Sequence, residues 1–270
     1  MTVDHPRSVL TIAGSDSGGG AGIQADLKTF AAHAVHGLSA LAALTAQHTR
    51  GVTAVHVPPL DFLGAQIDAC FDDFDIGAVK LGMLASAEVI DSVADALAAH
   101  GAPPLVVDPV MVATSGARLL AEDALDALRR RLLPLATVLT PNIPEAELLL
   151  GHAIPDADAA DAALDELLAL GPKAVLLKGG HLPEDGPMRD RYVDARGRRV
   201  FTHPRLERNG HGTGCTLASA IAANLCRGLS PGNACMAAAE YVHGALRHAT
   251  RPGRGAVDVL DHFWRPRPGG

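Results

Sequence analysis

The chain alternates between short apolar runs and longer stretches in which apolar residues recur every three or four positions. Residues 9–13 have the pattern of a buried strand, and the helical stripe that follows contains Ile23, Leu27, Phe30 and Ala34. Further apolar runs occur at residues 78–81, 105–107, 137–139 and 174–177, and helical stripes follow the first two of these. Short strands separated by amphipathic helices predict an α/β protein with a mainly parallel sheet that helices cover on both faces.

One stretch departs from this alternation. Residues 191–194 and 199–202 flank a turn at 195–197, which predicts a small antiparallel hairpin. No repeat, low-complexity linker or break in composition marks a second domain, so we expect residues 1–270 to form a single domain. Segments 1–8 and 251–270 are expected to be loosely packed tails, and the second is rich in Pro, Gly and Arg.

Composition and charge exclude several classes of function. The 270 residues are 48% apolar and carry a net charge of −7 without a basic stripe, so we expect no nucleic-acid partner. The sequence contains no apolar run of membrane-spanning length and no signal-peptide pattern at its start, which predicts a cytoplasmic protein without a membrane partner. Four cysteines without framework or zinc-site spacing are expected to be reduced thiols.

The run Gly210–Cys215 is the most informative motif. Its three glycines lie directly before an uncharged stretch, residues 215–226, that is typical of a buried helix. The unpaired N–H groups and the dipole at a helix start favour an anion such as phosphate. The same positive end is expected to lower the pKa of Cys215 and so favour a thiolate. The alternative is a tight turn that only precedes a core helix.

Polar residues follow several of the predicted strands. Gly14–Gly22 is too glycine-rich to be only a connection, but it fits neither the dinucleotide-binding nor the Walker pattern. Asp108, Asn142 and Glu145 follow two later strands, and oxygen ligands of this kind suit Mg²⁺. Each of them also fits a helix cap. Lys178 ends a further strand, where it can neutralise a phosphate or cap the sheet edge.

These motifs, taken in order, resemble the hydroxymethylpyrimidine/phosphomethylpyrimidine kinases of thiamine biosynthesis. The resemblance runs from about residue 10 to residue 248. It implies the three-layer α/β/α ribokinase-like fold, usually as a homodimer, with ATP and Mg²⁺ as cofactors. The implied reaction phosphorylates 4-amino-5-hydroxymethyl-2-methylpyrimidine and then its monophosphate. The segments that carry the resemblance are residues 13–26, 45–52, 80–84, 107–111, 140–147, 177–181 and 211–216.

The resemblance also implies roles for individual residues. Gly212, Thr213 and Gly214 would form the anion hole, and Cys215 takes the place of the aspartate base of many ribokinase-like enzymes. Asn142 and Glu145 would organise Mg²⁺ with Asp108 nearby, and Lys178, with Asn142 and Thr213, would face the nucleotide. The pyrimidine pocket would consist of Gly14, Asp26, Gln47, Met83 and Val110.

Two other functions stay open. A related branch of the family phosphorylates pyridoxal, although Gln47 favours the pyrimidine. A catalytically silent ligand-binding or regulatory domain would have the same fold, but the presence of Asp108, Glu145, Lys178 and Cys215 argues against it. His48 departs from the family pattern, which has Asn at this position. Residues 112–117 are a candidate lid.

Overall fold

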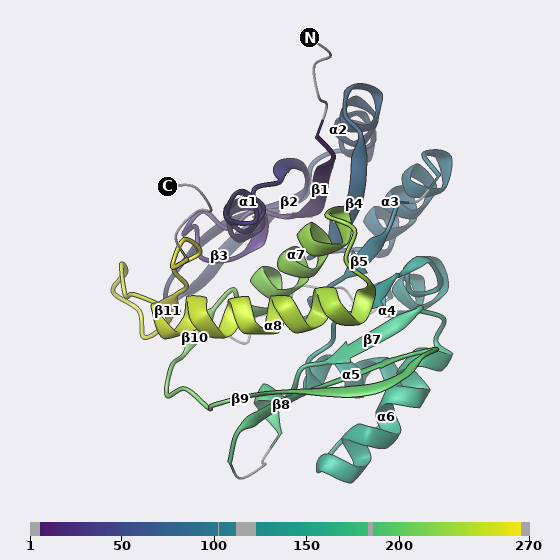
Figure 1. Ribbon diagram of the computed structural model, residues 1–270. Coiled ribbons are helices and arrows are strands. Elements are labelled where there is room, and N and C mark those ends of the chain that lie inside the picture. Colours follow the sequence, from purple (N-terminus) through teal and green to yellow (C-terminus); the bar gives the residue numbers. More distant parts are fainter. Residues whose placement is uncertain (1–5, 102, 112–122, 183–185, 266–270) are drawn as a thin grey trace.

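A computed structural model of the chain describes residues 6–101, 103–111, 123–182 and 186–265. In this part of the chain a single nine-stranded sheet runs in the order β3-β2-β1-β4-β5-β6-β7-β8-β9 (Figure 1). Its strands are β1 (Ser8–Gly14), β2 (His36–His48), β3 (Gly51–His56), β4 (Ile76–Leu81), β5 (Leu105–Val107), β6 (Val138–Leu139), β7 (Ala174–Leu177), β8 (Met188–Asp194) and β9 (Gly197–His203).

The centre of the sheet is parallel, and both edges are antiparallel. Strands β2, β1, β4, β5, β6 and β7 pair in parallel. The β8–β9 hairpin is the one that the sequence predicts. The antiparallel pair of β2 with β3 at the other edge was not predicted, because β2 continues well past the core and its end carries mixed apolar and polar residues.

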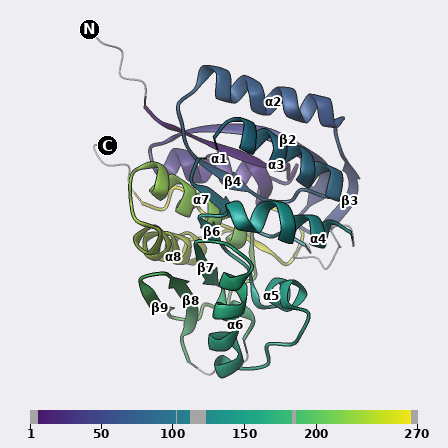
Figure 2. The ribbon, with the colours of Figure 1, turned by 90° about the vertical axis from the view of Figure 1, so that its right-hand side faces the viewer.

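Helices cover both faces of the sheet, which confirms the three-layer α/β/α architecture (Figure 2). One face packs against α1, α7 and α8, and the other against α2 to α6. The helices are α1 (Gly22–Ala32), α2 (Leu60–Asp73), α3 (Ala87–Ala99), α4 (Ala124–Ala127), α5 (Ile143–Leu150), α6 (Ala157–Ala169), α7 (Thr213–Cys226) and α8 (Pro231–Arg247), with a π-helical turn at Leu128–Leu132 and 3₁₀ turns at Leu133–Leu135 and Gly179–His181.

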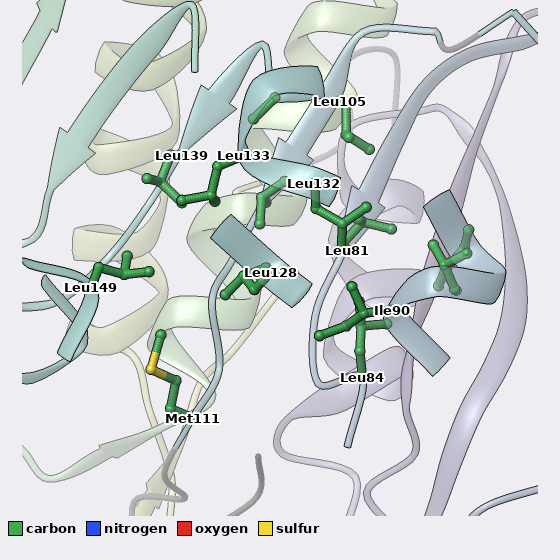
Figure 3. Close-up of a cluster of buried hydrophobic side chains, with 14 of the residues drawn as sticks. Leu81, Leu84, Ile90, Leu105, Met111, Leu128, Leu132, Leu133, Leu139 and Leu149 are labelled. Carbon is green, nitrogen blue, oxygen red and sulfur yellow. The ribbon is translucent and has the colours of Figure 1, made fainter. Parts of the chain in front are cut away.

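Successive side chains of a strand point to opposite faces of the sheet, so the buried residues form two cores, one on each face. Leu10 and Ile12 of β1 point into the larger core, and Val9 points into the other. Figure 3 shows part of the larger core, where Leu81 of β4 lies near Ile90 of α3. This packing fixes the carboxyl ends of the parallel strands, and polar residues follow directly after them.

The C-terminal segment is partly packed, contrary to the expectation of a loose tail over 251–270. Strand β11 (Asp258–Val259) pairs with β10 (Gly210–His211). Leu260 and His262 are buried, and the Trp264 indole N–H donates to the carbonyl of Tyr241 at 3.1 Å. Apolar side chains therefore hold residues 258–264 against α8. None of the helices in the described ranges combines the length and hydrophobicity that a membrane span requires.

Candidate active site

A cavity of about 800 Å³ opens at the carboxyl ends of the parallel strands. Loops after β1, β4, β5, β6 and β7 contribute to its wall, together with the start of α7. Asp26 does not line it. The other residues that the sequence singles out for the site all do: Gly14, Gln47, Met83, Asp108, Val110, Asn142, Glu145, Lys178, Gly212, Thr213, Gly214 and Cys215.

The two glycine-rich segments meet at the start of α7. Gly212 is the N-cap of α7 with a φ of +82°, and no side chain caps this helix start. A Cβ on Gly212 would collide with the carbonyl group of Gly20, so only glycine permits this close approach of the two loops. The first N–H groups of α7 therefore remain free of side-chain partners beside the cavity, as an anion site requires.

Asp16 organises the first glycine loop. Its carboxylate accepts hydrogen bonds from the N–H groups of Gly18 at 2.8 Å, Gly20 at 3.0 Å and Ala21 at 2.9 Å. Burial alone would raise the pKa of Asp16, but His211 and the N–H groups of Gly18 and Ala21 hold it below its usual value. The loop is thus folded around an ionised carboxylate.

Asp26 lies in the core beneath the site, which corrects its predicted place in the pyrimidine pocket. Its carboxylate accepts hydrogen bonds from the Lys80 ammonium at 2.9 and 3.0 Å, from Thr11 at 2.7 Å and from Ser219 at 2.6 Å. Both carboxylate oxygens of Asp26 are occupied by hydrogen bonds from these protein groups, so neither is available to a ligand. Lys80 reaches the cavity wall, and Asp26 raises its pKa although burial alone would lower it.

The Cys215 thiol does not have the lowered pKa that its place in the first turn of α7 predicts. Burial raises its pKa to about 11, while Lys80 opposes this rise and the carboxylates of Asp26 and Asp108 add to it. The loss of hydration around the thiol outweighs the effect of the helix end. This environment therefore favours the protonated thiol over the thiolate.

Lys178 joins the two carboxylates that the sequence places at strand ends. Its ammonium lies 3.0 Å from Asp108 and 3.6 Å from Glu145. Asn142 and Glu145 form a reciprocal capping box at the start of α5, with hydrogen bonds of 2.9 and 2.8 Å. The capping interpretation of this motif is therefore correct. The side-chain oxygen of Asn142 accepts a hydrogen bond from the backbone of α5.

Glu145 is buried, with 6% of its surface exposed. Burial, together with the nearby Asp108 carboxylate, raises the pKa of Glu145 to about 6, although Lys178 lowers it. One ammonium neutralises one of the two carboxylates and leaves the other short of positive charge. Within the described residues no cluster of three acidic, His or Cys side chains forms a complete metal site.

The residues present nevertheless fit a magnesium ion. Mg²⁺ is usually held by one or two carboxylates, with water and substrate phosphate as the other ligands. Asp108 and Glu145 supply hard oxygen donors at the cavity wall, and the single Lys178 ammonium lies between the two carboxylates.

Residues after β1, β2, β4 and β5 complete the cavity wall. Met83 lines it with 7% of its surface exposed, and a Cβ on Gly14 would lie only 2.8 Å from the Met83 methyl group. Gln47 near the end of β2 and Val110 after β5 also line the cavity. His48 is exposed and does not line the cavity. The candidate lid at 112–117 lies outside the described residues.

Sequence reasoning missed three residues of the site. Lys80 is a charged residue within an otherwise apolar strand, and that contrast is a usable signal. Asp16 is the only acidic residue within the first glycine loop, where free N–H groups call for an acceptor. His211 stands inside the glycine turn itself.

A three-layer α/β/α fold, a free helix start and buried lysines and carboxylates at one cavity define the class of ribokinase-like small-molecule kinases. The chain belongs to the phosphomethylpyrimidine kinase family, whose model matches residues 16–260. It is 48% identical to the hydroxymethylpyrimidine/phosphomethylpyrimidine kinase of Streptomyces coelicolor, over 96% of this chain and 95% of the relative. It is 49% identical to the Rhizobium meliloti kinase of the same name, over 95% and 98%.

Solved structures agree with the fold. A pyridoxal kinase from Staphylococcus aureus in complex with AMP-PCP and pyridoxal has a TM-score of 0.88 at 33% identity, covering 98% of this chain and 96% of that one. The phosphomethylpyrimidine kinase of Clostridium difficile has a TM-score of 0.78 at 44% identity, covering 87% and 97%. The predicted ribokinase-like fold and family are thereby confirmed.

Proposed function

We propose that the protein transfers the γ-phosphoryl group of ATP to the hydroxymethyl group of 4-amino-5-hydroxymethyl-2-methylpyrimidine, and then a second one to the resulting monophosphate. The observation that carries the proposal is the uncapped start of α7, which faces the cavity beside Lys178. A Cβ on Gly214 would lie 3.1 Å from the Lys178 ammonium. Backbone N–H groups and a fixed positive charge thus converge where a phosphoryl group would be transferred.

Positioning and charge stabilisation would supply most of the rate enhancement. Phosphoryl transfer requires little covalent work from the protein, because charge spreads over the oxygens of the transferred group. The N–H groups of Thr213 and Gly214 and the Lys178 ammonium are already held in place by α7 and β7. Little reorganisation is then needed when the phosphoryl group arrives.

Asp108 and Glu145 would hold the magnesium ion that accompanies ATP, and the ion would neutralise charge on the nucleotide phosphates. We expect Glu145→Gln to weaken the dependence of turnover on Mg²⁺. Turnover measured against Mg²⁺ concentration tests this role, and an unchanged profile in a folded variant would remove Glu145 from the metal shell.

Cys215 would take the proton from the hydroxymethyl group in the first step only. The monophosphate acceptor of the second step is already ionised and needs no base. Because burial raises the pKa of the Cys215 thiol to about 11, this role requires the thiol first to release its own proton to water, so that the thiolate can accept the hydroxymethyl proton and return to the neutral thiol. Lys80 favours the thiolate that forms, since it opposes the rise in pKa.

A substrate panel decides between the pyrimidine and pyridoxal. Pyridoxal kinases share the fold, but the relatives with 48% and 49% identity are pyrimidine kinases, and Gln47 offers a hydrogen-bonding amide to a pyrimidine ring. With Mg-ATP we expect a higher kcat/KM for the hydroxymethylpyrimidine than for pyridoxal. A preference for pyridoxal would overturn the substrate assignment, and no ATP consumption with any of them would favour a silent binding domain.

We also propose that the protein acts as a cytoplasmic homodimer. Apolar side chains are exposed on the β2–β3 side of the molecule, with Val55 49% and Phe62 59% accessible, which supports self-association. Light scattering of the purified protein tests the dimer, and a monomeric mass at micromolar concentration would contradict it.

A further inference from the structure

The ring of His211 lies between a carboxylate and an amide at the cavity wall. Its Nε2 atom is 3.0 Å from Oδ2 of Asp16 and 3.2 Å from Nε2 of Gln47. A ring nitrogen carries either a proton or a lone pair, so it cannot donate to Asp16 and accept from an amide N–H at once. At one of the two contacts, the partner atom must therefore be of the other hydrogen-bonding type, an acceptor instead of a donor or the reverse.

Asp16 decides which contact this is. Its carboxylate is 2% exposed and already accepts three backbone N–H groups, and its pKa lies below the usual value because of His211 and these donors, against the effect of burial. An ionised carboxylate can only accept hydrogen bonds. Nε2 of His211 must then carry the proton, and the Gln47 atom beside it must be an acceptor.

Thr45 leads independently to the same result. Its hydroxyl oxygen lies 2.8 Å from the carbonyl oxygen of Ser15 and 3.2 Å from Oε1 of Gln47. A hydroxyl has one proton, and the Ser15 carbonyl can only accept it. The lone pairs of Thr45 consequently face Gln47, and the Gln47 atom at this position must be a donor.

Both contacts are satisfied when the oxygen and nitrogen of the Gln47 amide exchange places, which alters no atomic position materially. We propose that His211 is a positioning residue that fixes the amide of Gln47, with its oxygen toward His211 and its nitrogen toward Thr45. His211 is itself held in place, because a Cβ on Gly20 would lie 2.6 Å from its ring. The hydrogen bonds then run in one direction, from His211 to Gln47 to Thr45 to Ser15.

A fixed Gln47 amide would discriminate between substrates by the substituent on their ring, and this inference rests on the proposed function. An amide free to rotate can pair with a ligand that presents either order of donor and acceptor, whereas a fixed amide accepts one order. A pyrimidine with an exocyclic amine differs from its oxo analogue in this order. His211 should therefore increase the discrimination between 4-amino and 4-oxo hydroxymethylpyrimidines.

The first experiment needs no turnover. Long-range ¹H–¹⁵N NMR of the ligand-free protein reports which ring nitrogen of His211 carries a proton. We expect a protonated Nε2, together with nuclear Overhauser contacts from the Gln47 NH₂ group to Thr45. A bare Nε2, or a Gln47 NH₂ group next to His211 instead, would overturn the proposal. Neither result depends on the identity of the substrate.

The second experiment is a double-mutant cycle on specificity. His211→Ala should lower the ratio of kcat/KM for the amino over the oxo compound by about tenfold, through KM, because about one oriented hydrogen bond is lost. In a Gln47→Leu background the same change should leave the ratio unaltered. An unaltered ratio in His211→Ala alone, or equal effects in both backgrounds, would refute the positioning role. Absence of activity on either compound in the unmodified protein would instead refute the proposed function.

Discussion

Glu145 destabilises the ligand-free protein because its carboxylate is buried beside that of Asp108. Its pKa rises from 4.5 to about 6, chiefly through burial. The folded protein therefore binds this proton more tightly than the unfolded chain does, and ionisation at higher pH costs stability. A pKa difference of about 1.5 corresponds to about 2 kcal/mol, at ~1.4 kcal/mol for each pH unit. Glutamine resembles the protonated carboxyl group, so Glu145→Gln should escape this cost.

The expected effect grows with pH over a defined window. The variant should be more stable than the unmodified protein by about 1 kcal/mol at pH 5 and by about 2 kcal/mol at pH 8, and the difference should vanish below about pH 4. Urea unfolding across this range measures it. Glu147→Gln is the matched control for the chemical change, because Glu147 lies on the same helix and its carboxylate accepts the Ile154 N–H. A variant that is less stable at every pH would show that the capping box and the ion pair to Lys178 outweigh burial, and would refute the reasoning.

Three further changes probe the base, the buried ion pair and the glycine turn. Cys215→Ala should slow phosphorylation of the hydroxymethyl group by about 10²–10⁴-fold and transfer to the monophosphate much less; equal losses would mean that the thiol only shapes the site. Lys80→Met should lower the unfolding free energy by about 3–5 kcal/mol in denaturant titrations, and adding Asp26→Asn should recover part of it; a full-size loss in the double variant would contradict the charge argument. Gly212→Ala should abolish activity, whereas Gly228→Ala, at a similar φ of +89° but in open space, should cost only about 1–2 kcal/mol of stability and no turnover, as steady-state assays would show.

Much of the fold could be predicted from the sequence because periodicity records it directly. The central parallel strands are short apolar runs, and the helices between them carry one apolar face, so both element types are visible without tertiary information. Strand β3 is different. Four of its residues are exposed, so no burial pattern marks it, and only its pairing with β2 makes it a strand.

The residues that line the cavity could largely be predicted, but their charge interactions could not. Glycine runs and polar residues after strands identify the cavity wall, because parallel strands end at one edge of a sheet. Asp26 was misplaced since its partner Lys80 lies 54 positions along the chain, and no local pattern joins them. The pKa of Cys215 was misjudged for the same reason. A helix start can be recognised from sequence, whereas the depth of burial and the charges facing it depend on other elements.

Helix α7 has no solvent-facing side between Thr216 and Cys226, where every residue is buried. It is enclosed by the sheet, α1 and α8, and its side chains are mostly small. Exposing its backbone thus requires α8 to separate from the rest of the domain, which amounts to unfolding the protein. Its amide hydrogens should exchange with solvent only through global opening. The glycine turn that we propose as the anion site is therefore anchored on a segment that should be among the slowest to open in the described part of the chain.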